Sequence, residues 1–344
     1  MDRIGHIVFL GKVFKVLSES EEWPGYSCGI SEQEFKSMRE AISAAQIHNP
    51  WFTRQAIEHS LNAWADTLDE DSVRSWVSGY DGPNKPKRVA IIMAGNIPLV
   101  GLHDLLSVLI SGHHAIVKTS QQDHTLIEMV LHILFRLSEE WKERIELVRG
   151  RLQGHDAVIA TGSSNTGRYF EHYFGKVPNI IRKNRSSAAY LTGTESEEDL
   201  HRLGKDIFQY FGLGCRSVSK LFIPEEYDID RFFKGIFEHH PIIEHSKYAN
   251  NYDYHRALYL MNDDSFLDNG FLLVKEDSNL HSPVGTLHVQ RYSSQEALRE
   301  ELESVGDELQ CIIGQDDIPF GESQRPSLTD YADGVNTLDF LSAL

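Results

Sequence analysis

The chain has 344 residues, 41% hydrophobic and 24% charged, which is typical of a globular protein large enough for two domains. Its formal net charge of −18 argues against nucleic acid or an anionic membrane surface as the main partner, because like charges repel. There is no signal-peptide pattern and no apolar run of about 18 residues. Three widely separated cysteines predict neither a disulfide framework nor a zinc site, so we expect a cytoplasmic protein.

The N-terminal segment, residues 1–83, is predicted to be mostly helical. Ser31 and Glu34 have the spacing of a capping box at a helix start. The aromatic turn at residues 49–53 is expected to pack on a neighbouring domain rather than to contact a ligand. Turn-forming residues at 81–86 then mark the beginning of a new domain.

Alternating strands and helices are predicted from residue 88 onward. Helices are expected at 98–111 and 123–137. Short apolar strands are expected at 89–93, 114–118, 145–148, 157–160, 180–181 and 188–191. This alternation predicts an α/β fold with a parallel sheet covered on both faces, here a Rossmann-type domain at residues 84–205. Ligands of such sheets bind at the carboxyl ends of the strands.

Three loops follow strands of this sheet, at residues 94–98, 118–122 and 161–167. The third is rich in small residues and opens a helix, an arrangement that suits a phosphate or the edge of a dinucleotide. Neither a Gly-x-Gly-x-x-Gly sequence nor a Walker A sequence is present, so these loops by themselves indicate only a candidate site.

Cys215 follows a helical run that ends near Phe211 and breaks at two glycines. Glycine in these places lets the backbone come close to the group that the sulfur attacks. A short helix is expected after Cys215, whose first N–H groups would lower the thiol pKa, and Arg216 and Lys220 are expected to add positive charge. The alternative is that Cys215 is a small buried hydrophobic residue.

A second α/β domain, residues 206–320, is predicted to carry this thiol. Its predicted elements are helices at 229–239 and 294–305 and strands at 271–275, 285–289 and 309–314, with a long polar stretch up to Met261. The tail, residues 321–344, is expected to pack on a neighbour. No metal site is expected. The histidine pairs His113–His114 and His239–His240, the second with His245 nearby, have no acidic residues at a suitable spacing.

Four sequence pieces together resemble the aldehyde dehydrogenase superfamily: residues 95–99, 117–120, 161–167, and 212–215 followed by 219–224. Within it the chain is most similar to the short acyl-CoA reductases related to the fatty-acid reductase of bioluminescent bacteria, over roughly residues 48–344. The resemblance implies an aldehyde dehydrogenase-like fold, a cysteine-bearing second domain and a homo-oligomer.

The resemblance also implies site residues. Cys215 matches the nucleophile, and Asn96 matches the side-chain donor of the oxyanion hole, acting with the Cys215 backbone N–H. The implied cofactor-binding residues are Lys118, Ser120, Gln121, Thr161, Gly162, Ser163 and Gly167. Where NAD-preferring relatives carry a glutamate, this chain has neutral Gln121, which does not repel a 2′-phosphate. We therefore expect NADPH, with NADH as the alternative.

Two departures from the superfamily favour reduction over aldehyde oxidation. The glutamate that activates the hydrolytic water is absent at residues 181–184, and a second glutamate position holds Asn279. The expected function is reduction of an acyl-CoA or acyl-carrier thioester to an aldehyde. The alternatives are an acyl-phosphate (semialdehyde) reductase with Arg182 and Lys183 at the phosphate, and a catalytically idle acyl- or nucleotide-binding subunit. Long acyl chains are implied by the resemblance, but the residues do not give their length.

Overall fold

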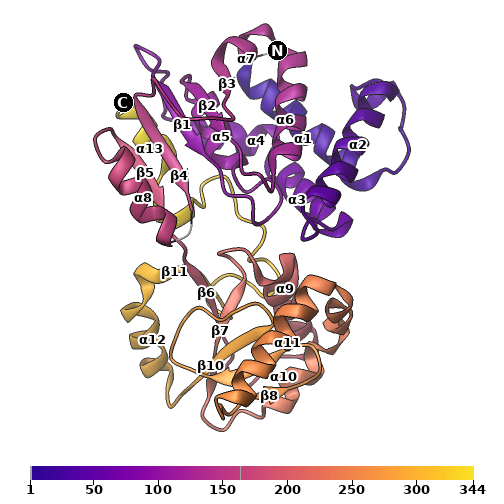
Figure 1. Cartoon of the computed structure of the whole chain (residues 1–344), viewed down its shortest axis with the longest axis vertical. Coiled ribbons are helices and arrows are strands. Elements are labelled where there is room, and N and C mark those ends of the chain that lie inside the picture. The colour runs from indigo at the N-terminus through magenta and orange to yellow at the C-terminus, as the bar shows by residue number, and fades with distance from the viewer. Residues whose placement is uncertain (1, 163) are drawn as a thin grey trace. The chain divides into compact units, whose positions relative to one another are not determined.

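The computed structural model describes residues 2–162 and 164–344, which divide into two compact units (Figure 1). Unit 1 contains the chain up to Asn184 together with Ser327–Leu344, and unit 2 is Arg185–Pro326. The division falls before the expected limit at residue 205, because Leu200 and Leu203 of helix α9 (Glu197–Phe208) lie in the core of unit 2. Both units are α/β, as predicted.

Unit 1 is built on a sheet of five parallel strands in the order β3-β2-β1-β4-β5. The strands are β1 (Arg88–Ile92), β2 (His114–Lys118), β3 (Ile145–Leu147), β4 (Ala157–Thr161) and β5 (Asn179–Arg182). Each lies within one residue of its predicted bounds. The prediction succeeded because strands of a parallel sheet are buried on both faces and therefore form short, continuous apolar runs.

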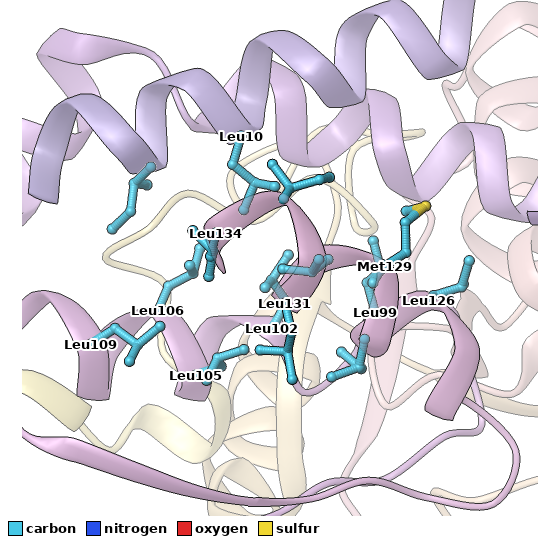
Figure 2. Packing of buried hydrophobic residues seen from close by; sticks show 14 of the residues in the cluster. Leu10, Leu99, Leu102, Leu105, Leu106, Leu109, Leu126, Met129, Leu131 and Leu134 are labelled. Carbon is cyan, nitrogen blue, oxygen red and sulfur yellow. The ribbon is translucent and has the colours of Figure 1, made fainter. Parts of the chain in front are cut away.

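Helices cover both faces of this sheet, and alternate residues of β1 show how. Val89 and Ile91 belong to the large core under α1 (Arg3–Glu19), α5 (Leu102–Ile110) and α6 (His124–Leu137), whereas Ala90 lies in a smaller cluster with residues of α8 (Ser164–Phe174). Figure 2 shows leucines of α1, α5 and α6 pointing toward one another: Leu10, Leu106 and Leu134. This packing fixes the sheet edge described below.

The N-terminal segment is helical, as predicted, and packs into the core of unit 1. Its helices are α1, α2 (Glu32–His48), α3 (Arg54–Thr67) and α4 (Glu70–Val77). The capping box of Ser31 and Glu34 is formed at the start of α2. Phe52, in the aromatic turn, is fully buried in the same core as the leucines of α5 and α6. Core packing therefore accounts for this aromatic residue.

Unit 2 is built on a six-stranded sheet in the order β11-β6-β7-β10-β9-β8, parallel except for the β8–β9 pair. The strands are β6 (Ser186–Tyr190), β7 (Val218–Pro224), β8 (Leu267–Asp268), β9 (Leu273–Glu276), β10 (Thr286–Tyr292) and β11 (Leu309–Ile313). Helices α9 and α10 (Ile229–Gly235) pack on one face, and α12 (Gln295–Ser304) packs on the other.

Three predicted segments differ from the structure. Helix α5 begins at Leu102 instead of residue 98, because Leu99 adopts a left-handed backbone with φ 57° that a helix cannot include. Helix α10 ends at Gly235 and is followed by a 3₁₀ segment, Phe237–Glu244. The expected polar stretch contains helix α11 (Ser246–Met261), whose buried side chains are tyrosines rather than aliphatic residues.

The C-terminal segment of unit 1 packs on its own chain. Leu338 and Leu341 of α13 (Thr337–Ser342) are buried in the core of unit 1. The buried guanidinium of Arg182 donates to the Thr337 hydroxyl at 2.8 Å and forms an ion pair with Asp104 of α5, also at 2.8 Å. Residues 327–344 of the tail are therefore part of unit 1, and residues 321–326 belong to unit 2. The expected role of the tail in oligomers stays a prediction. Among the described residues, no helix combines the length and apolar character needed to cross a membrane.

We predict that Leu341→Ala lowers the free energy of unfolding by about 3 kcal/mol, because it leaves a cavity in the core. Urea unfolding followed by tryptophan fluorescence would measure the change. Ser342→Ala, at the exposed neighbouring position, is the control and should change the midpoint little. A loss below about 1 kcal/mol for Leu341→Ala would contradict the placement of the tail in this core.

Candidate active site

Strand pairing brings three of the predicted loops to one edge of the unit 1 sheet. Ile92, near the end of β1, pairs with Lys118 of β2 on one side and with Ala160 of β4 on the other. Because the strands are parallel, the loops that follow them lie at the same carboxyl edge. The predicted residues at this edge that are described are Asn96, Lys118, Ser120, Gln121, Thr161, Gly162 and Gly167. Ser163 lies outside the described residues.

The loop after β1 approaches the loop after β2 closely. A Cβ atom on Gly95 would lie 2.5 Å from the Ser120 hydroxyl oxygen, so only glycine fits there. The next residue, Asn96, is exposed at the sheet edge, and so is Gln121 in the turn before α6. Ser120 itself accepts a hydrogen bond from the Gln122 N–H at 3.1 Å, which fixes this turn.

Cys215 lies in unit 2, in the turn between α9 and β7, and its side chain is exposed. The alternative interpretation, a buried hydrophobic cysteine, is therefore wrong. The helix expected after Cys215 is absent: the turn leads directly into β7 at Val218. No helix N-terminus follows the thiol, so that part of the argument for a lowered pKa does not hold.

The backbone before Cys215 has an unusual conformation. Tyr210, Phe211 and Gly212 have φ values of 54°, 60° and 77°, three left-handed residues in succession. This conformation is unfavourable for residues other than glycine and persists where the surroundings fix it. Part of that support is visible, since the Phe211 ring lies against the His245 ring with centroids 4.3 Å apart and an interplanar angle of 32°. The strained segment sets the direction in which the chain enters the cysteine turn.

The carbonyl of Cys215 is held by a buried serine on the neighbouring strand. The Ser187 hydroxyl of β6 donates to this carbonyl at 2.8 Å, and its oxygen lies 3.0 Å from the Cys311 sulfur. Because the hydroxyl proton is used on the carbonyl, the Cys311 thiol is the donor in the second contact. Sequence reasoning missed Ser187, because a serine in a buried strand carries no signal that sets it apart.

The two residues after Cys215 are also fixed, by hydrogen bonds to residues 323 and 324. Arg216 is buried and donates to the Ser323 carbonyl at 3.4 Å, and the Gln324 amide donates to the Ser217 hydroxyl at 3.2 Å. The segment that holds them is fixed in turn by Asp206 of α9, which accepts the N–H groups of residues 321 and 323. Burial raises the pKa of Asp206, and these two N–H groups oppose that rise. Arg216 therefore contributes to the structure of the turn.

Lys220 of β7 is fully buried and holds a loop between β9 and β10. Its ammonium group donates to the Asp277 carbonyl, and two neighbours act similarly: the Ser219 hydroxyl donates to the Leu280 carbonyl at 2.8 Å, and the His288 ring donates to the Asn279 carbonyl at 2.9 Å. Three side chains thus fix the loop that carries Asn279. Burial lowers the pKa of Lys220 to about 8.

The acyl-phosphate alternative loses support in the structure, because both of its proposed phosphate ligands have other partners. Arg182 does not face solvent: it is buried between Asp104, Thr337 and the Ala332 carbonyl, so it is not placed to bind a phosphate. Lys183 pairs with Glu171 at 2.8 Å. Across the described parts of the chain, no three His, Cys, Asp or Glu side chains gather where they could hold a metal ion.

Comparison with known proteins shows the family to which this chain belongs. The model of the family described as acyl-CoA reductase (LuxC) matches residues 15–238, which is more than half of the chain and includes both Asn96 and Cys215. The chain belongs to the acyl-CoA reductase (LuxC) family. This membership supports an oxidoreductase and confirms the resemblance inferred from the sequence. Comparison with curated protein sequences gives no significant match.

Solved structures share the fold of this acyl-CoA reductase family member at low identity. Aldehyde dehydrogenase 21 from Physcomitrella patens, in complex with the product succinate, is 14% identical, with 92% of this chain and 74% of that chain covered and a TM-score of 0.63. NADP-dependent glyceraldehyde-3-phosphate dehydrogenase from Bacillus halodurans, complexed with NADP, is 13% identical, with coverages of 90% and 72% and a TM-score of 0.61. The predicted aldehyde dehydrogenase-like fold is therefore confirmed.

We predict that the stability contributed by Lys220 depends on pH. The unfolded chain keeps the lysine proton up to about pH 10, whereas the folded protein releases it near pH 8, so the unfolded state binds more protons between these values. The free energy of unfolding of wild type relative to Lys220→Met should therefore rise by roughly 1 kcal/mol per pH unit from pH 8 to 10.

Chemical denaturation at several pH values would measure this difference. Lys205→Met, which removes an exposed lysine of α9, is the matched control. Its free energy of unfolding should differ from that of wild type by an amount that stays constant from pH 8 to 10. If the difference in the free energy of unfolding between wild type and Lys220→Met did not change with pH, the assignment of Lys220 as a buried, easily deprotonated amine would be wrong.

Proposed function

We propose that the protein reduces an acyl thioester, acyl-CoA or an acyl-carrier thioester, to an aldehyde through an acyl-enzyme on Cys215. The observation that carries this proposal is the exposed thiol on a strained turn, whose carbonyl is fixed by Ser187, within the region matched by the acyl-CoA reductase family. A rigid, accessible sulfur is what nucleophilic catalysis requires. The exposed thiol and the fixed carbonyl are those of a positioned residue rather than of a core residue.

The proposed chemistry has two halves. The Cys215 thiolate attacks the thioester carbonyl, the bond to the departing sulfur breaks, and the released thiolate takes up a proton. Reduction of the resulting acyl-enzyme gives a thiohemiacetal, which collapses to the free aldehyde and returns the Cys215 thiolate. Asn96 would donate a hydrogen bond to the carbonyl oxygen in both tetrahedral states, with the Cys215 N–H as second donor. The sum is thioester plus reductant plus one proton giving aldehyde, thiol and oxidised reductant.

The unit 1 sheet edge fits a nicotinamide cofactor. Lys118 ends β2 there, Gly162 precedes α8, and Gln121 is exposed without charge. A helix N-terminus after small residues suits a pyrophosphate, and a neutral side chain tolerates a 2′-phosphate. When bound, NADPH would supply the hydride that reduces the acyl-enzyme. Lys118 and Gln121 would hold its adenosine ribose, with Ser120, Thr161, Gly162, Ser163 and Gly167 beside its phosphates.

The absence of a water-activating glutamate from residues 181–184 supports reduction over hydrolysis. Residues 181 and 182 belong to strand β5, and the Arg182 side chain is occupied in the core of unit 1. The same observation disfavours an acyl-phosphate substrate, because the proposed phosphate ligand is buried and paired. A thioester is therefore the substrate class we propose.

Intact-protein mass spectrometry tests the first half-reaction. Wild type mixed with tetradecanoyl-CoA should gain the mass of one acyl group, and the adduct should disappear when NADPH is added. Cys215→Ala should gain none, because it lacks the nucleophile. Cys311→Ala is the matched control, since it removes the other thiol at this turn and should still be acylated.

Either of two results would overturn the proposal. The first is acylation of Cys215→Ala to the same extent as wild type. The second is the lack of an adduct on wild type with tetradecanoyl-CoA and with the corresponding acyl-carrier thioester.

We predict that Gln121→Glu shifts cofactor preference from NADPH toward NADH. A carboxylate at this exposed position would repel the 2′-phosphate and accept hydrogen bonds from the ribose hydroxyls. The ratio of kcat/KM for NADPH to that for NADH should fall about tenfold or more, an effect of about 1.4 kcal/mol. Gln122→Glu, one residue further along the same turn and also exposed, is the control. An equal shift in both variants would mean that the charge acts at a distance and that Gln121 does not contact the ribose.

A further inference from the structure

The loop that carries Asn96 is fixed at both ends. At its start, Gly95 lies against Ser120, with no room for a side chain. At its end, the Leu99 N–H donates to Asp123 Oδ2 at 2.7 Å. The intervening Pro98 carbonyl accepts from the hydroxyl of Ser60 at 2.9 Å. Side chains from α3 and from the start of α6 therefore determine the course of a loop between β1 and α5.

Leu99 is the strained point of this loop. Its φ of 57° is left-handed, which is unfavourable for a leucine. Two features hold it there: the bond from its N–H to Asp123, and burial of its side chain. Figure 2 shows Leu99 near Leu126 and Met129 of α6 in the core of unit 1. The backbone turns at Leu99 because both its N–H and its side chain are anchored on the beginning of α6.

Asp123 is an unusual anchor, because it is an acid that is 2% exposed. It precedes α6 but makes no side-chain cap bond to that helix. Its Oδ2 takes the Leu99 N–H, and its Oδ1 has no partner within the described part of the chain. Burial raises the pKa of Asp123 well above its usual range, which favours the protonated form. An unpartnered buried acceptor is unfavourable for folding, so packing alone does not explain an acid here.

The restraints leave one exposed residue between them. Gly95, Pro98 and Leu99 are buried, Ile97 is half-buried, and Asn96 is exposed. Fixing the backbone on either side of Asn96 limits the directions that its amide can take. Pre-organisation of this kind is what an oxyanion-hole donor needs, because a donor that reorients during the reaction stabilises the transition state less.

We propose that Asp123 is a positioning residue for the reduction: it holds the Leu99 turn and thereby aims the Asn96 amide at the developing oxyanion. This inference rests on the proposed function. Asp123 acts through Asn96 and does not itself touch substrate. Ser60 supports the same loop from α3, which gives the N-terminal helical segment a part in catalysis that its sequence does not reveal.

Single-turnover acylation by tetradecanoyl-CoA, followed by mass spectrometry, tests this role in four variants. Asp123→Ala should slow acylation at least tenfold with less than a threefold change in KM, because binding does not use Asn96. Asp123→Asn should keep at least a third of the wild-type rate, since its amide oxygen can still accept the Leu99 N–H. Asn96→Ala alone and Asn96→Ala combined with Asp123→Ala should be equally slow, because a residue acting through Asn96 has no effect once Asn96 is gone.

Three results would each contradict the role proposed for Asp123. The inference is wrong if Asp123→Ala acylates at the wild-type rate, if Asp123→Asn is as slow as Asp123→Ala, or if Asp123→Ala slows the Asn96→Ala enzyme a further tenfold. If Asp123→Ala does not fold, Asp123→Ser replaces it, because serine is a good residue at a helix start but is too short to reach Leu99. No adduct on wild type would overturn the proposed function and this inference together, whereas normal wild-type acylation with an unaffected Asp123→Ala overturns the inference alone.

Discussion

The pairing of β1 with β2 on one side and β4 on the other is the constraint on which the candidate site in unit 1 depends. It aligns Ile92, Lys118 and Ala160, so that three loops that are far apart in the sequence start at one edge. Strand β1 can take this central place because Val89, Ala90 and Ile91 are all buried, each toward one of two apolar layers. The candidate site residues at this edge are therefore positioned by apolar strand residues that take no part in the proposed reaction.

The two candidate catalytic residues are supported by a common device. In each case a buried polar side chain from another element binds a backbone group at or near a left-handed residue. Asp123 accepts the N–H of the left-handed Leu99, and Ser187 donates to the Cys215 carbonyl, which follows the left-handed Phe211 in the same turn region. Backbone conformations of this kind survive only where several contacts act together. The strain and its compensation are local, and both lie near residues that we propose to be catalytic.

The predictability of each element follows from the range of the interactions that form it. Strands such as Arg88–Ile92 were predicted well because continuous burial leaves a continuous apolar run. The start of α5 and the helix expected after Cys215 were wrong, because a left-handed Leu99 and a tight turn depend on contacts with Asp123 and Ser187, which are distant in sequence. Helix α11 was missed because its buried side is made of Tyr248, Tyr252 and Tyr259. Asn96 and Cys215 could be named from motifs, whereas their supports could not.

Unit 1 is discontinuous, and this has a consequence for how the protein is made. Arg182 ends β5 long before Thr337 and the Ala332 carbonyl, which complete its hydrogen bonds, have been synthesised. Leu338 and Leu341 fill the core of unit 1 from the last residues of the chain. On the ribosome, unit 2 has its whole sequence available before unit 1 does. The first segment of unit 1, residues 1–184, must therefore wait with an incomplete core and without two of the groups that accept hydrogen bonds from Arg182. Assembly of unit 1 can therefore be completed only after the whole of unit 2 has been synthesised.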